Sequence, residues 1–281
     1  MPWHLTDDVG LFAEHAWDLL AADPAEQTVT LTIVEFLRAG RSYSDAPALF
    51  GWCVDGDRVR GAVCMTAPFE MVLAAVPGDA LPDLVAALRA HDVPLPGVNG
   101  EVTTVERFVR AWVEGTGLRP RTVSNQRLYA LGTLRPPEPA PPGRPRPAGD
   151  ADLDLAARWY GEFQREAGVP VTDAGQWARI GIGDRRIWLW EEADGAVVSL
   201  AGRTAPAAGV CRVAPVYTPP AYRRRGYGAA VTATCTQDAL DRGVGHVVLF
   251  TDLANPTSNA IYQRVGYRPI SDRRVVRFEP A

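Results

Sequence analysis

The hydrophobic residues in the first half of the chain follow two kinds of spacing. Some recur every three to four residues, as in an amphipathic helix, and others alternate with polar residues, as in a half-buried strand. This pattern predicts helices at 8–22, 81–90 and 103–115, and strands at 51–54, 59–66, 69–76 and 124–134. The first two strands flank Asp55-Gly56-Asp57, whose composition is typical of a hairpin turn.

The second half of the chain repeats this arrangement. Its pattern predicts helices at 152–168, 173–182, 222–241 and 256–265, and strands at 187–192, 196–203, 209–217, 246–251 and 267–279. The order of elements is therefore similar in the two halves: a helical region, a hairpin, a strand, further helices and a final strand. We expect two diverged copies of one fold.

A proline-rich segment separates the two halves. Seven of the thirteen residues from 136 to 148 are proline, which excludes a helix or a central strand and favours an extended spacer. The chain length of 281 residues suits two domains. We therefore expect one domain at 1–135, a linker at 136–148 and a second domain at 149–281.

The composition excludes several classes of protein. Hydrophobic residues make up 47% of the chain, enough for two cores, and the net charge of −4 argues against a nucleic-acid binder. All 29 cationic residues are arginine, so the abundance of arginine alone carries no functional weight. The four cysteines lack the spacing of a metal site, and we expect no metal and a reduced, cytoplasmic protein. No apolar run is long enough to span a membrane.

The most informative segment is 209–228. Pro215 lies within a predicted strand and has no N–H group to donate, which predicts a bulge or a sheet edge. The backbone groups of Val216, Tyr217 and Thr218 would then lack strand partners, and a ligand that carries amides could satisfy them.

The same segment continues into the start of a helix. Gly226 and Gly228 allow close approach of the backbone to a ligand. The unpaired N–H groups of a helix N-terminus favour a phosphate, and the run from Arg223 to Arg225 adds positive charge.

A second motif covers Asn255 to Tyr267. Asn255 and Pro256 are typical of the first positions of a helix, and Gly266 is typical of its end. A spacing of three, four and seven residues then places Asn255, Ser258 or Asn259, and Tyr262 on one helix face.

Three other interpretations of these motifs remain open. The glycines and arginines could form an ordinary loop before a helix, and Asn255 with Tyr262 could be a structural cap and a surface tyrosine. A dinucleotide site is a third reading. Against it, the first glycine of that motif should directly follow the strand, and Val231 occupies the position of its third glycine.

The motifs Val-x-Pro-Val-Tyr-Thr-Pro, Arg-x-x-Gly-x-Gly and Asn-Pro-x-Ser-Asn-x-x-Tyr-x-x-x-Gly-Tyr, over about 209–267, resemble the GNAT superfamily of N-acetyltransferases. The resemblance implies an α+β fold with two GNAT-like domains, each a central mixed, mostly antiparallel sheet flanked by helices. It also implies acetyl-CoA as co-substrate. The residues that would bind it are Val216, Tyr217 and Thr218 at the pantetheine arm, Arg223, Arg224, Arg225, Gly226, Tyr227, Gly228 and Ala229 at the pyrophosphate, and Asn255, Ser258 and Asn259 on the other side of the arm.

The first half resembles a degenerate copy of this fold. Where the arginine–glycine loop would stand it has Val76-Pro-Gly-Asp-Ala-Leu-Pro82, and Asp79 and Asp83 would repel phosphate. We expect no CoA in this half, which would stabilise the protein and shape the acceptor cleft.

The resemblance implies direct transfer of an acetyl group from acetyl-CoA to a small-molecule amine. Tyr262 would lie beside the thioester sulfur and protonate the departing thiolate, and a backbone N–H near Val216 would polarise the carbonyl. Glu191, Glu192, Asp252 and a water relay all remain candidates for the base. Two alternative functions also remain open: a non-catalytic acyl-CoA sensor, and an acyltransferase for a larger amine metabolite, as in mycothiol synthesis.

Overall fold

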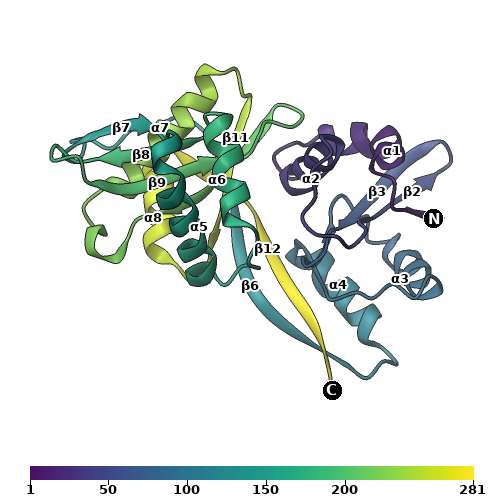
Figure 1. Ribbon diagram of the computed structural model, residues 1–281. Helices are drawn as coiled ribbons and strands as arrows, with labels where there is room; N and C mark the ends of the chain where they lie inside the picture. Colours follow the sequence, from purple (N-terminus) through teal and green to yellow (C-terminus); the bar gives the residue numbers. More distant parts are fainter. The chain divides into compact units, whose positions relative to one another are not determined.

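The computed structural model describes all 281 residues, and their contacts divide the chain into two compact units (Figure 1). Unit 1 comprises Met1–Leu128, Asp252–Ala254 and Ile270–Ala281. Unit 2 comprises Tyr129–Thr251 and Asn255–Pro269. Both units are mixed α+β structures, and each is described separately below.

Unit 1 has a mostly antiparallel sheet in the order β1-β2-β3-β4-β5-β12, in which β4 and β5 pair in parallel. The elements from the first half of the chain are β1 (Trp3–Thr6), α1 (Val9–Ala21), α2 (Thr28–Arg38), β2 (Leu49–Asp55), β3 (Arg58–Met65), β4 (Met71–Leu73), α3 (Leu81–Ala90), β5 (Gly97–Glu101), α4 (Val102–Val113) and β6 (Leu118–Leu131).

The helices of unit 1 cover both faces of its sheet. In Figure 1, α1 and α2 lie on one side of the β2–β3 hairpin, and α3 and α4 lie on the other. Asp8 caps α1 by accepting hydrogen bonds from the backbone N–H groups of Gly10 and Leu11. The apolar faces of α3 and α4, including Leu84 and Phe108, are fully buried against the sheet.

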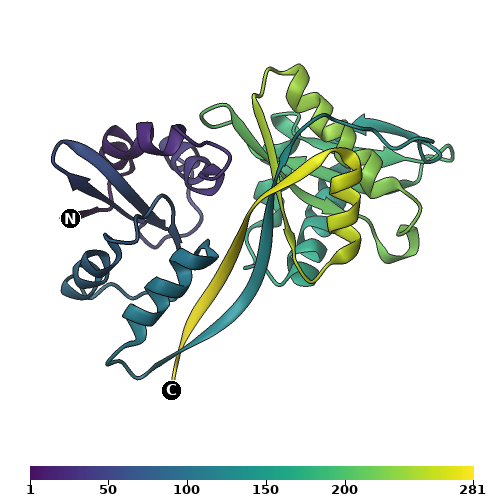
Figure 2. The same ribbon diagram turned by 180° about the vertical axis from the view of Figure 1, so that it is seen from behind.

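Unit 2 has its strands in the order β6-β11-β10-β9-β8-β7, in which β10 and β11 pair in parallel and β7 to β10 are antiparallel. Its elements are β7 (Arg144–Pro147), the short helix η1 (Asp150–Asp152), α5 (Leu153–Ala167), α6 (Ala174–Gly183), β8 (Ile187–Glu191), β9 (Val197–Arg203), β10 (Val210–Tyr217), the short helix η2 (Pro220–Tyr222), α7 (Tyr227–Asp241), β11 (His246–Asp252), α8 (Pro256–Val265) and β12 (Tyr267–Pro280). Helices α5 and α6 lie on one face of the sheet (Figure 1), and α7 and α8 lie on the other (Figure 2).

The two halves of the chain contain the same elements in the same order. From β1 to β6 and from β7 to β12, the order of the main elements is strand, helix, helix, three strands, helix, strand, helix, strand. The last strand of each half, however, lies next to a strand from the other half of the chain. Residues Arg273–Arg277 of β12 pair with β5 of unit 1, and β6 lies next to β11 of unit 2. Each sheet is therefore completed by a strand from the other half of the chain.

The structure contains every helix and strand that the sequence pattern predicts, but several limits differ. The helix predicted at 222–241 begins at Tyr227, because Arg224 and Gly226 have positive φ angles and cannot continue a right-handed helix. The strand predicted at 69–76 covers only Met71–Leu73. Four of the longer elements were not predicted: β1, α2, β5 and β7.

The proline-rich segment is partly a strand rather than a free spacer. Residues Arg144–Pro147 pair with β8 as the edge strand β7, a position where proline costs no ladder hydrogen bond. The Trp190 indole N–H also donates to the carbonyl oxygen of Pro142. The segment lies inside unit 2. The two compact units are defined by contacts within the structure and do not show which segments descend from one copy of the fold. The division into domains at 1–135 and 149–281 therefore stays a prediction.

The pairing of β5 with β12 predicts that Gly97→Ala destabilises unit 1. A Cβ atom at Gly97 would lie 2.1 Å from the carbonyl oxygen of Val276 and 2.9 Å from the Cα atom of Arg277. These are backbone atoms of the partner strand, so the strands would have to separate. We expect a loss of about 2–3 kcal/mol in the free energy of unfolding, measured by urea denaturation.

The control for this variant is Gly117→Ala, because a Cβ atom at Gly117 would meet no atom within 4 Å. Equal unfolding free energies for the two variants would contradict the close approach of β12 to β5.

Candidate functional site

The strands β10 and β11 pair over only part of their length. Their parallel ladder joins Val210–Arg212 to His246–Val248, although β10 continues to Tyr217. On the other side of β10, the ladder with β9 shifts register between Val213 and Val216. This shift confirms the bulge predicted from Pro215. Val216 and Tyr217 pair with Ala201 and Leu200 of β9, so the prediction that they lack strand partners is wrong on that side. Beyond Arg212, only the edge of β10 that faces β11 has no ladder partner.

A buried serine fixes the end of β10. The Ser199 hydroxyl, from β9, lies 3.1 Å from the carbonyl oxygen of Tyr217 and 2.8 Å from the Thr218 hydroxyl. The carbonyl oxygen of Thr218 in turn accepts a hydrogen bond of 2.8 Å from Nε of Arg223. Two of the carbonyls in the predicted ligand-binding segment therefore already have partners within the protein.

Arg223 and Tyr217 are both tied to α5. Nη2 of Arg223 lies 2.6 Å from Glu166, and the Tyr217 hydroxyl donates to the same carboxylate at 3.1 Å. The Arg223 guanidinium also stands 5.9 Å from the centre of the Tyr217 ring. Burial, together with hydrogen bonding to Glu162, holds the pKa of Tyr217 well above its usual value. These contacts orient the loop between β10 and α7. Arg223 therefore has a structural role in holding this loop, which the sequence did not predict.

The first turn of α7 presents backbone N–H groups without a side-chain cap. Gly226 stands at the N-cap with a φ angle of +89°, and no side chain accepts a hydrogen bond there. Arg224, exposed in the same loop, forms no ion pair, whereas the guanidinium of Arg225 lies over the Tyr222 ring at 5.8 Å. An uncapped helix N-terminus beside a free guanidinium suits an anionic group.

Tyr227, the first residue of α7, points away from that opening. Its side chain is buried, and its hydroxyl donates to the Glu192 carboxylate. This hydrogen bond to Glu192 raises the pKa of Tyr227. Its predicted contact with a pyrophosphate would therefore involve its backbone N–H.

The polar residues at the start of α8 hold that helix in place. Oδ1 of Asn255 accepts from the Ser258 N–H at 3.0 Å, which confirms Asn255 as the N-cap. Nδ2 of Asn259 donates to the carbonyl oxygen of Asn255 at 2.7 Å, and Oδ1 of Asn259 accepts from the Tyr129 hydroxyl at 2.8 Å. Their predicted contacts with a ligand stay predictions beside these structural roles.

Tyr262 lies in α8 with its hydroxyl unpaired. The side chain is half-buried and packs, together with Val216 and Ala229, against one core cluster. Its ring meets the ring of Tyr267 edge-on at 6.3 Å, and its hydroxyl forms no hydrogen bond within the protein. Burial raises the pKa of Tyr262 to about 12, so this hydroxyl keeps its proton at neutral pH. Each of the three predicted segments therefore places one residue against this core cluster.

The candidate bases all have partners. Glu191 forms ion pairs with Arg146 at 2.5 Å and Arg144 at 3.2 Å, and its hydrogen bonds to these arginines lower its pKa. Glu192 accepts from Tyr227, and Oδ1 of Asp252 accepts from the backbone N–H of Ala254 at 2.8 Å. None of the three is assigned as a base on this geometry.

Two further features bear on the chemistry of the chain. The cysteines Cys211 and Cys235 are buried, and burial raises the pKa of both thiols, so they pack as small apolar residues. The structure has no cluster of three or more potential metal ligands, and it has no helix long and apolar enough to cross a membrane.

Three residues that shape this region were not found from the sequence. Ser199, Glu166 and Tyr129 come from β9, α5 and β6, far along the chain from the motifs they support. None carries a local pattern that distinguishes it from other polar residues.

Comparison with known proteins finds similarity to one family over part of the chain. The model of the acetyltransferase (GNAT) family matches residues 156–267. No curated protein matches the chain by sequence. Among solved structures, a GCN5-related N-acetyltransferase from Kribbella flavida is 22% identical with a TM-score of 0.60, covering 92% of this chain and 96% of its own. One from Sphaerobacter thermophilus is 19% identical with a TM-score of 0.61, covering 99% and 95%.

A tandem GNAT protein from the clavulanic acid biosynthesis pathway is similar over nearly the whole chain. It is 13% identical with a TM-score of 0.57, and the match covers 99% of this chain and 98% of that one. At such identities these similarities show the fold alone. The predicted fold class, α+β with mostly antiparallel sheets flanked by helices, is confirmed.

The contacts at the end of β10 predict that Ser199→Ala destabilises unit 2. The substitution leaves the carbonyl oxygen of Tyr217 without its hydroxyl partner, and an unsatisfied buried acceptor costs about 1–3 kcal/mol. A decrease of that size in the free energy of unfolding is expected in urea denaturation.

Ser258→Ala provides the matched control, since the Ser258 hydroxyl forms no hydrogen bond and only its backbone N–H does. Its unfolding free energy should stay within about 0.5 kcal/mol of the parent. If Ser199→Ala lowers the free energy of unfolding no more than Ser258→Ala does, Ser199 does not stabilise the end of β10.

Proposed function

Because residues 156–267 match the model of the acetyltransferase (GNAT) family, we propose that the protein transfers an acetyl group from acetyl-CoA to the primary amine of a small molecule. The transfer is direct, within a ternary complex of enzyme, acetyl-CoA and amine. The observation that carries this proposal is the combination of an unpaired β10 edge with the uncapped start of α7.

The residues at these two elements fit acetyl-CoA. The N–H groups in the first turn of α7 and the guanidinium of Arg224 receive the pyrophosphate, because both are donors without partners in the protein. Gly228 leaves room beside them, since even a Cβ atom there would lie 3.4 Å from the Thr218 hydroxyl. The open edge of β10 around Val216 bonds the amide groups of the pantetheine arm.

Tyr262 donates a hydrogen bond to the leaving group in this proposal and keeps its own proton. Acyl transfer from sulfur to nitrogen releases a thiolate, whose reference pKa of about 8.5 lies well below that of the Tyr262 hydroxyl. The tyrosine hydroxyl, protonated and unpaired, donates a hydrogen bond to the departing sulfur. A backbone N–H near Val216 stabilises the negative charge that develops on the carbonyl oxygen. The acceptor nitrogen loses its proton to a group that we leave unassigned.

Binding of acetyl-CoA tests the first part of this proposal. Isothermal titration calorimetry should detect acetyl-CoA and free CoA but not NADH. Arg224→Ala should weaken acetyl-CoA about tenfold, because it removes a charge-assisted hydrogen bond to phosphate. The control Arg179→Ala removes an arginine of the same charge from α6, on the other face of the sheet, and should not change the affinity.

Binding of NADH alone would overturn the assignment of the nucleotide. If acetyl-CoA binds but no amine in a broad panel releases CoA thiol, the non-catalytic sensor becomes the better description.

Kinetics of Tyr262→Phe test the second part. Loss of this hydrogen-bond donor should lower kcat roughly ten- to a thousandfold while KM for acetyl-CoA changes little. Tyr160→Phe, in α5, removes a hydroxyl that contacts only Thr172 and should keep the parent kcat. An unchanged kcat in Tyr262→Phe would exclude this hydroxyl from the reaction.

A further inference from the structure

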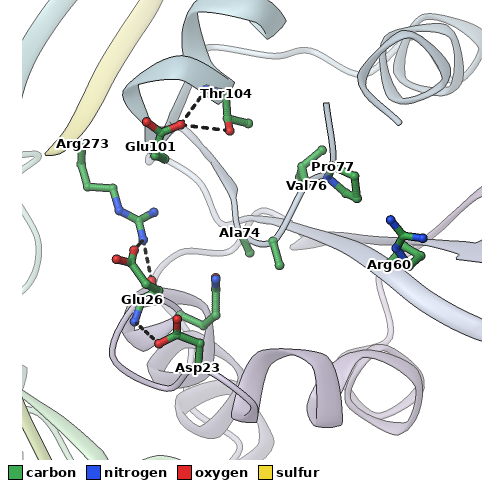
Figure 3. Close-up of a pocket in the computed structure, with 11 residues that line it drawn as sticks. Asp23, Glu26, Arg60, Ala74, Val76, Pro77, Glu101, Thr104 and Arg273 are labelled. Atoms are coloured by element: carbon green, nitrogen blue, oxygen red, sulfur yellow. Dashed lines mark hydrogen bonds and ion pairs between the residues drawn. The ribbon is translucent and has the colours of Figure 1, made fainter. Parts of the chain in front are cut away.

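Unit 1 contains a pocket of about 380 Å³ at the carboxyl ends of β4 and β5 (Figure 3). Residues Ala74–Pro77, which follow β4, form its apolar wall, and Glu101 ends β5. The rest of the lining comes from Asp23, Glu26 and Gln27, which precede α2, and from Arg60, Thr104 and Arg273. All of these residues belong to unit 1, and the volume is within the usual range for small-molecule sites.

The pocket contains a buried polar group without a partner. Gln27 is only 9% exposed, and its side-chain amide forms no hydrogen bond in the protein. Arg273 is 6% exposed, and its Nη2 donates to Glu26, but its Nε has no partner. Buried polar groups are usually hydrogen-bonded, because leaving them unpaired costs free energy. An unpaired amide in a pocket wall is therefore available to a ligand.

The charges of the pocket are not balanced. Arg273 is paired with Glu26 at 2.5 Å, and Arg60 is paired with Asp55 at 3.2 Å outside the pocket. The carboxylates of Asp23 and Glu101 have no cationic partner. Figure 3 shows them on opposite sides of the pocket, with Ala74 between them.

Both of these carboxylates have oxygen atoms left for a ligand. Oδ1 of Asp23 accepts from the backbone N–H of Glu26 at 3.3 Å, and Oε2 of Glu101 accepts from the backbone N–H of Thr104 at 3.0 Å. Oδ2 of Asp23 forms no hydrogen bond, and a carboxylate oxygen that accepts one hydrogen bond can accept another. Burial alone would raise the pKa of Glu101, but the hydrogen bonds from Thr103 and Thr104 outweigh it and hold that pKa below its usual value. Glu101 is therefore ionised at neutral pH.

We propose that this pocket binds a small organic ammonium compound. Its ammonium group pairs with the carboxylate oxygens of Asp23 or Glu101, its polar atoms bond the Gln27 amide, and its carbon chain lies against Ala74–Pro77. The two uncompensated carboxylates exclude phosphates from this pocket by repulsion. The copy of the fold in unit 1 thus has a ligand site of the opposite charge preference to the site proposed in unit 2.

Three probes of equal chain length test this inference: butylamine, butanol and butyrate. Their dissociation constants are measured on the full-length protein by ligand-observed NMR titration without acetyl-CoA. Butylamine should bind at least about tenfold more tightly than butanol or butyrate, because only its ammonium pairs with a carboxylate. Asp23→Asn keeps the hydrogen bond to Glu26 and removes the charge, and it should weaken butylamine about tenfold.

Two further variants locate the site. Gln27→Leu should also weaken butylamine, whereas Asp57→Asn, an exposed acid in the β2–β3 turn, should bind like the parent protein. Melting temperatures check that each variant is folded. The inference is overturned if the three probes bind alike or if butylamine does not bind. It is also overturned if Asp23→Asn and Gln27→Leu both bind butylamine as the parent does. That result would place the amine at another site, such as the acceptor site of unit 2.

Discussion

Beyond Arg212, β10 and β11 no longer share hydrogen bonds, and the chemistry proposed for unit 2 depends on that separation. Pro215 contributes to it, since a residue without an N–H group cannot support a ladder on both sides of its strand. A continuous ladder would satisfy the backbone of Val216 internally and leave nothing for a substrate. Ser199 and Arg223 hydrogen-bond the carbonyl oxygens of Tyr217 and Thr218, so the end of the strand is not left entirely without partners. The strand end is thus fixed in position while one of its edges stays open.

Local sequence signals were sufficient for the features that depend on a single residue. Pro215 predicts the bulge, and Asn255 predicts the start of α8. The GNAT resemblance rests on the same residues. They could be interpreted from the sequence because their effect does not depend on distant parts of the chain.

Features that arise from contacts between distant segments could not be predicted. Strand β5 has the sequence Gly-Val-Asn-Gly-Glu, which has weak strand propensity, and it is held by β4 and β12 on its two sides. The role of Glu166 as the shared partner of Arg223 and Tyr217 likewise requires α5 to lie beside β10. Neither the pairing nor the partner has a signal in its own stretch of sequence.

The exchange of β6 and β12 has a consequence for how the chain is made. On the ribosome, β1 to β5 emerge long before β12, so the sheet of unit 1 keeps an unpaired edge at β5 until the second half has been synthesised. Strand β6 likewise emerges before the β11 strand beside which it lies. An exposed strand edge favours association with other chains. Expression of either half by itself would make that transient edge permanent, because the missing strand is encoded in the other half.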